Sequence, residues 1–122
     1  MSLRLHSALR NPINSDSGQN SIQGYLMKPS EALATHRSSI RRIVASHRAC
    51  NPRVFGSVVH GDDTEDSDLD ILIDPTADTS LFDIGAIRHE LLQLLGLPVD
   101  VLTPKALPEK FRAIVLAEAL PI

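Results

Sequence analysis

Aromatic residues are scarce in this chain of 122 residues, which has no tryptophan and four aromatic side chains, Tyr25, Phe55, Phe82 and Phe111. Proteins that bind single-stranded nucleic acid commonly stack its bases on clusters of exposed aromatic rings, and this chain has little from which to build one. A net charge of −3 also gives no broad attraction to a phosphate backbone. We therefore expect no direct nucleic-acid binding, and a core built from Leu, Ile, Val and Ala.

Cysteine and long apolar runs are also lacking. Cys50 is the sole cysteine, which excludes an intrachain disulfide and fits a reducing compartment such as the cytoplasm. No apolar run approaches the roughly 20 residues that a membrane-spanning helix needs. Since 43% of the residues are hydrophobic and 22% are charged, as in ordinary globular proteins, we expect a cytoplasmic protein with one folded domain and no membrane association.

The first 26 residues differ from the rest of the chain. Residues 11–20 are polar, rich in turn formers and without hydrophobic periodicity, which is typical of a loop or a disordered segment. We therefore predict a flexible N-terminal extension at 1–26 and a folded domain at 27–122. A tail that docks on a partner is the alternative interpretation of the extension.

From residue 27 onward, helical and strand patterns alternate. Ser30 is predicted to cap a first helix, which must end before Asn51-Pro52 because the residue before a proline avoids helical geometry. Ser80 caps a second helix that ends at Gly96 and has the apolar stripe Leu81, Ile84, Ile87, Leu91, Leu94 and Leu95. The other patterns predict strands at 53–56, 68–74 and 99–102, one helical turn at 57–60 and a last helix at about 108–119. This order predicts an α/β (α+β) domain in which a small mixed sheet carries flanking helices.

Two carboxylates on the second predicted strand are the first candidates for chemistry. Asp68 and Asp70 stand two residues apart, so their side chains point to the same face of the strand. Leu69, Ile71 and Ile73 point to the opposite face, which we expect to be the core. Two like charges this close repel one another unless a cation lies between them. Carboxylate oxygens without a His or Cys cluster favour Mg²⁺ or Mn²⁺ over zinc.

Two further features add to this pair. Gly56-Ser57 follows a strand and begins a helical turn, which offers main-chain N–H groups and a hydroxyl to a phosphate. Asp100 lies between Val99 and Val101 on the third strand, and if that strand pairs with the second, three carboxylates converge. Each feature alone is more commonly a solvated strand face, a turn or a surface carboxylate, and their combination at this spacing points to metal-dependent nucleotidyl transfer.

The pattern resembles a known enzyme superfamily. Gly56-Ser57, ten residues and then Asp68-x-Asp70 is similar to the signature of the DNA polymerase β-like nucleotidyltransferases. The fuller form, with Gly61 and Ser67-Asp68-Leu-Asp70, resembles the minimal nucleotidyltransferase (MNT) branch, many of whose members are antitoxins of HEPN/MNT toxin–antitoxin pairs. The resemblance covers the chain from about Met27 to its end.

The resemblance implies a role for each matching residue. Gly56, Ser57, His60, Gly61 and Ser67 are expected to bind the nucleotide. Asp68, Asp70 and Asp100 are expected to be catalytic and to bind Mg²⁺ or Mn²⁺. The implied reaction transfers AMP from ATP to a hydroxyl, in characterised relatives a tyrosine of the HEPN ribonuclease partner, and thereby silences the toxin.

His60 departs from the family pattern, because many relatives have an arginine immediately before the glycine matched to Gly61. Histidine is mostly neutral at pH 7 and donates fewer hydrogen bonds than arginine. This difference leaves open a catalytically weak or inactive MNT-fold antitoxin that neutralises its toxin by binding alone. A third alternative, transfer to a small molecule, generally uses an additional substrate domain, so we expect the acceptor site to come from a partner or from a second subunit of an oligomer.

Overall fold

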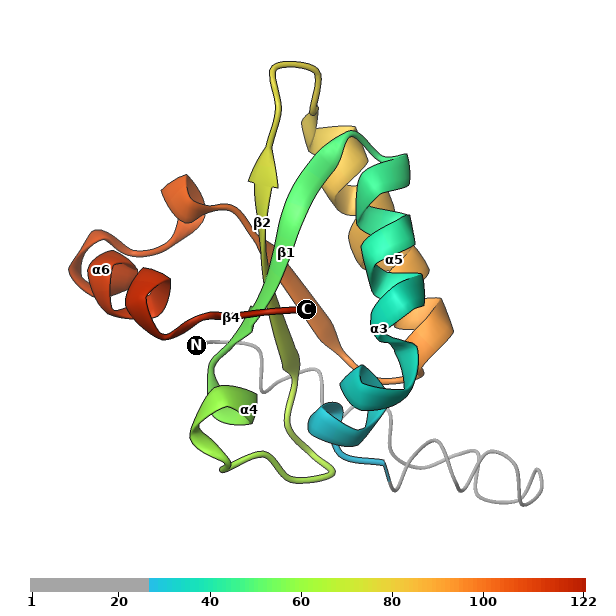
Figure 1. Cartoon of the computed structure of the whole chain (residues 1–122), viewed down its shortest axis with the longest axis vertical. Coiled ribbons are helices and arrows are strands. Elements are labelled where there is room, and N and C mark those ends of the chain that lie inside the picture. The colour runs from blue at the N-terminus through green and yellow to red at the C-terminus, as the bar shows by residue number, and fades with distance from the viewer. Residues whose placement is uncertain (1–26) are drawn as a thin grey trace.

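The computed structural model describes residues 27–122 and builds them around a mixed sheet. The predicted extension at 1–26 lies outside the described residues. Within the described part, the sheet has four strands in the order β3-β2-β1-β4 (Figure 1), with β2 and β3 parallel and β1 antiparallel to both β2 and β4. The elements are α3 (Pro29–Ser46), β1 (Ala49–Phe55), α4 (Ser57–His60), β2 (Leu69–Pro75), α5 (Leu81–Leu95), β3 (Val99–Leu102), the 3₁₀ turn η2 (Pro104–Ala106), α6 (Glu109–Glu118) and β4 (Leu120–Pro121). The predicted fold class, a small mixed sheet with flanking helices, is confirmed.

One face of the sheet forms the main core. Helices α3 and α5 lie together against this face (Figure 1), where Leu69, Ile71 and Ile73 of β2 have no exposed surface. The period-two alternation of β2 therefore predicted its buried face correctly. Because burying a Leu or Ile side chain contributes roughly 1.5–3 kcal/mol, this face supplies most of the hydrophobic stabilisation and leaves the opposite face for other uses.

The opposite face carries a second, smaller cluster that the sequence did not predict. Phe55 of β1, Leu72 of β2 and Leu107 are buried there, and packed against them are Leu102 of β3, Val115 of α6 and Ala119, which follows α6. Leu72 lies on the same face as Asp70, two residues further along the strand. This cluster therefore attaches α6 beside the carboxylate of Asp70.

The first helix begins earlier than predicted. Its N-cap is Lys28, so Pro29 rather than Ser30 opens the helix, and proline is favoured there because the first N–H has no helical partner. The Glu31 carboxylate accepts a hydrogen bond from the main-chain N–H of Lys28 at 2.8 Å. The main-chain N–H of Ser30 donates to Asp63 at 2.9 Å, which ties the loop before β2 to the start of α3.

Strand β1 is longer than the predicted 53–56 and runs through Asn51-Pro52. The pairing register with β2 shifts between Cys50 and Arg53, which marks a β-bulge. Asn51 adopts a positive φ of 53° in it, a conformation that asparagine tolerates better than most residues. The bulge accommodates Pro52, whose missing N–H would otherwise interrupt the ladder. The helix does end before Asn51-Pro52, as predicted, but the proline does not exclude a strand.

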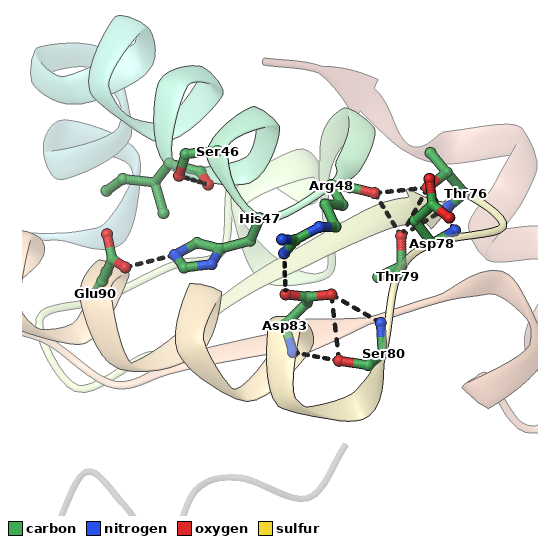
Figure 2. Close-up of polar contacts among 10 residues, drawn as sticks. Ser46, His47, Arg48, Thr76, Asp78, Thr79, Ser80, Asp83 and Glu90 are labelled. Carbon is green, nitrogen blue, oxygen red and sulfur yellow. Dashed lines mark hydrogen bonds and ion pairs between the residues drawn. The ribbon is translucent and has the colours of Figure 1, made fainter.

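The start of α5 is held by the predicted cap and by a network around it (Figure 2). The Ser80 hydroxyl accepts from the main-chain N–H of Asp83, and the Asp83 carboxylate accepts from the main-chain N–H of Ser80 at 2.8 Å. Arg48, in the turn after α3, donates to the other Asp83 oxygen at 3.1 Å. Gly96 ends the helix in the left-handed conformation, as predicted.

One member of the predicted α5 stripe is wrong. Leu81 is 85% exposed, whereas Ile87, Leu91 and Leu95 are buried. Leu81 lies in the first turn of the helix and is not part of the core cluster, although its spacing puts it on the buried face. Periodicity identifies the face of a helix but not how far along the helix that face is covered.

Strand β4 was not predicted and closes the sheet beside β1. Leu120 pairs with Val54 and Pro121 with Arg53, and the main-chain N–H of Ile122 donates to Pro52 at 3.0 Å. Arg41 of α3 donates to the main-chain oxygen of Ile122 at 2.7 Å.

Among residues 27–122, no helix has the length and apolarity that crossing a membrane requires.

Removing the hydroxyl of Ser80 tests the α5 cap. Ser80→Ala is expected to lower the free energy of unfolding by about 1 kcal/mol because Asp83 loses the acceptor of its main-chain N–H. Urea denaturation at neutral pH measures this. Ser46→Ala is the matched control, since its hydroxyl only donates to a carbonyl within α3, and its effect is expected to stay below about 0.5 kcal/mol. Equal effects of the two substitutions would contradict the cap.

Asp83 gives the fold a specific dependence on acid. Its pKa lies below the ordinary 3.8 because the main-chain N–H of Ser80 donates to the carboxylate, an effect that the Ser80 hydroxyl and Arg48 reinforce against desolvation. A lowered pKa means that the stabilisation is complete above the unfolded-state pKa and is lost as the pH falls through the folded-state value. Asp83→Asn is therefore expected to flatten the fall in urea midpoint below about pH 4. An acid slope equal to that of the wild type would contradict this assignment.

Candidate active site

A cavity of about 550 Å³ lies between α4, the start of β2 and α6. It is on the side of the sheet away from α3 and α5, next to the small apolar cluster under α6. Six of the eight predicted site residues line it: Gly56, Ser57, His60, Ser67, Asp68 and Asp70. Its other lining residues are Phe55, Asp62, Asp66, Phe111, Ile114, Val115 and Glu118. The fold therefore gathers most of the predicted constellation into one cavity.

The second and third strands are paired, which is the condition on which the convergence of the three carboxylates depended. Asp70 of β2 is paired in register with Asp100 of β3, and residues paired in a parallel ladder project from the same face about 4.8 Å apart. Asp68 directly precedes β2 and lines the cavity with Asp70. Asp100 is not among the residues that line the cavity, although it lies in the described part of the chain. Asp70 thus stands between the cavity and Asp100.

Position 56 requires a glycine because the side chain of Asp70 approaches it closely. A Cβ atom added at Gly56 would lie 2.4 Å from Oδ2 of Asp70, a distance at which atoms overlap. The backbone of Gly56, with φ 79° and ψ −144°, is also in a region that is open almost only to glycine. Both observations show that the position admits no side chain, and that the Asp70 carboxylate lies directly against the start of α4.

The predicted helical turn after this glycine is present. Helix α4 spans Ser57–His60 and is capped by Gly61, which adopts the left-handed conformation with φ 74°. Gly61 does not line the cavity and has open space where a Cβ atom would lie. Its conformation therefore serves to close the turn, while Ser57 presents the first turn of α4 to the cavity.

His60 finds a protein partner across the cavity. Its Nε2 lies 2.8 Å from Oε1 of Glu118 on α6, and both side chains line the cavity and are half exposed. This contact joins α4 to α6. A phosphate would have to compete with Glu118 for that nitrogen, so the predicted role of His60 toward a nucleotide stays a prediction.

The acidic loop before β2 divides into structural and cavity-facing residues. Ser67 accepts a hydrogen bond from the main-chain N–H of Thr64 at 2.8 Å, which shapes the turn into β2. Asp63 caps α3 through Ser30, whereas Asp62 and Asp66 line the cavity. Asp74, the next acidic residue on the Asp70 face, bonds to Arg53 and Asn51 outside the cavity.

The wall made by α6 was not predicted from the sequence. Phe111, Ile114 and Val115 face the cavity together with Glu118. Their spacing of three and four residues puts them on one side of a helix, and this was the available signal. On a short helix, however, the same apolar spacing is equally typical of a face that packs on the core, so the spacing alone does not predict a cavity wall.

The three aspartates have the donor chemistry of a divalent metal site. In residues 27–122, no group of three or more His, Cys, Asp and Glu side chains is already assembled around a metal position. Asp68, Asp70 and Asp100 nevertheless provide hard carboxylate oxygens on one face of two adjacent strands, which is the ligand type that Mg²⁺ and Mn²⁺ prefer. The residues present therefore fit such a metal by their chemistry.

The two glycines that flank α4 allow a matched test of the close approach. Both have positive φ, but a Cβ atom at Gly61 meets nothing within 4 Å. Gly61→Ala is expected to cost about 1 kcal/mol of stability from backbone strain alone. Gly56→Ala is expected to cost about 3 kcal/mol because it adds the collision with Asp70. Urea denaturation of both variants measures the difference, and equal losses would contradict the packing of Asp70 on Gly56.

Comparison with known proteins agrees with this geometry. The chain matches the nucleotidyltransferase domain family over residues 38–122, a range that contains every predicted site residue. It is 32% identical over 80 residues to a candidate protein adenylyltransferase of Methanocaldococcus jannaschii, covering 66% of this chain and 86% of that protein. It is 40% identical over 67 residues to the protein adenylyltransferase MntA of Thermococcus cleftensis, covering 55% and 68% respectively.

Solved structures share the fold. A structure described as that of a candidate minimal nucleotidyltransferase superposes with a TM-score of 0.69 and 38% sequence identity, covering 76% of this chain and 95% of the other. A crystal structure of a toxin–antitoxin with AMP-PNP superposes with a TM-score of 0.59 at 16% identity, covering 69% of each chain, and shows likeness of fold. The chain therefore belongs to the minimal nucleotidyltransferase branch of the nucleotidyltransferase domain family.

Proposed function

We propose that this nucleotidyltransferase is a protein adenylyltransferase that transfers AMP from ATP to a hydroxyl group of a partner protein. The observation that carries the proposal is the register of Asp70 with Asp100, with Asp70 packed against Gly56 at the wall of the cavity. This arrangement puts carboxylates beside a backbone segment suited to phosphate. Nucleotidyl transfer requires both features at one place.

Asp68, Asp70 and Asp100 are proposed to hold Mg²⁺ or Mn²⁺. A bound divalent metal would offset the charge of the phosphates and of the acidic wall formed by Asp62, Asp66, Asp68 and Asp70. Without such a cation these carboxylates would repel a triphosphate. The acidic cavity and an anionic substrate are therefore compatible only when a cation is bound with the nucleotide.

The chain's own residues bind and orient the reactants. The first turn of α4, with Gly56 and Ser57, offers main-chain N–H groups and a hydroxyl to the triphosphate. In the transfer, the acceptor oxygen forms a bond to the α-phosphorus, and the bond from that phosphorus to the oxygen bridging to the β-phosphate breaks. Pyrophosphate leaves, and Asp100 is proposed to accept the proton of the acceptor hydroxyl.

The acceptor and the partner are inferred from relatives. Two relatives are named as protein adenylyltransferases, which favours a protein acceptor. The structure of a toxin–antitoxin with AMP-PNP has the same fold, which supports ATP as the donor and a toxin as the partner. We propose that the chain acts in the cytoplasm as the antitoxin of a HEPN-type toxin and modifies a tyrosine of that toxin.

Transfer of label from α-³²P-ATP with Mg²⁺ onto the partner tests the proposal. Asp68→Asn and Asp70→Asn are each expected to reduce labelling by a factor of at least about 100, in line with loss of a transition-state contact worth roughly 2.7–4 kcal/mol. Asp74→Asn is the matched control, because Asp74 lies on the same strand but outside the cavity. It is expected to retain labelling at temperatures where the variant is folded.

Two results would count against the proposal in different ways. Label that persists in both aspartate variants would remove Asp68 and Asp70 from the reaction. No label from any nucleoside triphosphate, with the toxin still neutralised by the double variant, would mean that this chain acts as an antitoxin by binding alone.

A further inference from the structure

The cavity has two chemically different walls. Its walls on α4, β2 and the preceding loop carry the carboxylates of Asp62, Asp66, Asp68 and Asp70. The wall on α6 carries the apolar side chains of Phe111, Ile114 and Val115, together with Glu118, whose carboxylate contacts His60. A ligand that occupies the whole cavity must therefore carry a positive charge, or bind together with a cation, at one end and have an apolar part at the other.

Much of the apolar surface of the α6 wall remains exposed and is not packed in the core. No residue of α6, Glu109–Glu118, is buried, and the exposed fractions of Phe111 and Ile114 are 47% and 55%. Val115 and Ala119 attach the helix to the small cluster, while Arg112 bonds the main-chain oxygens of Pro104, Lys105 and Leu107. Phe111 and Ile114 therefore present apolar surface that nothing else in residues 27–122 covers.

We propose that Phe111 and Ile114 hold the base of the nucleoside triphosphate whose phosphates lie at the acidic wall. The inference rests on the proposed function and adds to it the residues that bind the base. A nucleotide joins an anionic triphosphate to a flat, largely apolar base through a ribose, so a single molecule matches both walls. An aromatic ring can stack on any base because every base has a π-face.

The position of Asp100 assigns the α6 wall to the nucleotide rather than to the acceptor. Asp100 is on β3, at one edge of the sheet, and it does not line the cavity. The acceptor hydroxyl must reach Asp100, so it approaches from the β3 side of Asp70. Helix α6 lies between η2, which follows β3, and β4 (Figure 1), and its wall faces the cavity that Asp100 does not line. This leaves the α6 wall to the donor nucleotide.

The residues of this wall indicate what it recognises. Phe111, Ile114 and Val115 have no hydrogen-bonding side-chain groups, and the ammonium of Lys110 is 5.8 Å from the centre of the Phe111 ring, near the outer limit of a cation–π contact. Contact with these side chains depends on the apolar area of the base rather than on the hydrogen-bond donors and acceptors at its edge. These three side chains therefore favour purines over pyrimidines, while Glu118 on the same wall has a carboxylate that contacts His60.

Binding of the Mg²⁺ complexes of AMP-PNP and of inorganic tripolyphosphate, measured by isothermal titration calorimetry on the full chain, tests the inference. Phe111→Ala is expected to weaken AMP-PNP binding roughly 5- to 150-fold, as for the loss of one stacked base, and to leave tripolyphosphate binding unchanged. Leu116→Ala is the matched control on the same helix, since Leu116 is 40% exposed and does not line the cavity. It is expected to change neither affinity. Ile114→Ala provides a second cavity variant, with a smaller effect in the same direction.

Each contrary outcome identifies what fails. If the Phe111→Ala variant binds AMP-PNP with wild-type affinity, the inference is overturned while the proposed function stands. If this variant also transfers less AMP to the partner, the α6 wall binds the acceptor. Equal losses for AMP-PNP and tripolyphosphate also overturn it, because the wall would then act on the whole site. Failure of the wild type to bind either compound contradicts the proposed function itself, and the inference with it.

Discussion

The contact between the carboxylate of Asp70 and the backbone of Gly56 sets the geometry of this site. It brings the start of α4, which follows β1, against the second residue of β2, and it leaves no room for a Cβ atom at Gly56. The in-register pairing of Asp70 with Asp100 then places β3 on the other side of the same carboxylate. Asp70 is thus surrounded by the backbone segment suited to phosphate, by the neighbouring Asp68 and by the third aspartate.

The two faces of the sheet have different roles: one packs in the main core and the other carries the candidate active site. On one face, Leu69, Ile71 and Ile73 are fully buried under α3 and α5 and contribute most of the hydrophobic stabilisation. On the other face, Asp70 and Leu72 alternate with them, so the rigid main core holds the carboxylate in place without covering it. Helix α6 attaches to this second face through a few side chains and lacks a buried residue. An acidic site can therefore remain open on a domain of this size.

Local chemistry determined which parts could be predicted. The alternation of β2, the Ser80 cap and the turn from Ser57 to Gly61 depend on neighbouring residues, and each was predicted correctly from the sequence. The pairing of Asp70 with Asp100 was a conditional expectation that depended on strand order. The bulge at Asn51, the exposure of Leu81, strand β4, the contact of His60 with Glu118 and the α6 wall all depend on segments distant in sequence. Periodicity carries no information about which of these segments meet.

A crystal structure with Mn²⁺ and AMP-PNP would test the central claim most directly, because the anomalous signal of manganese locates the metal independently of the phosphates. The account predicts an anomalous peak within coordination distance of the Asp68 and Asp70 carboxylates, roughly 2.0–2.3 Å from their oxygens, with the triphosphate against the first turn of α4. Manganese bound elsewhere, or a nucleotide seated away from Gly56 and Ser57, would contradict the claim that this cavity is the site of nucleotidyl transfer.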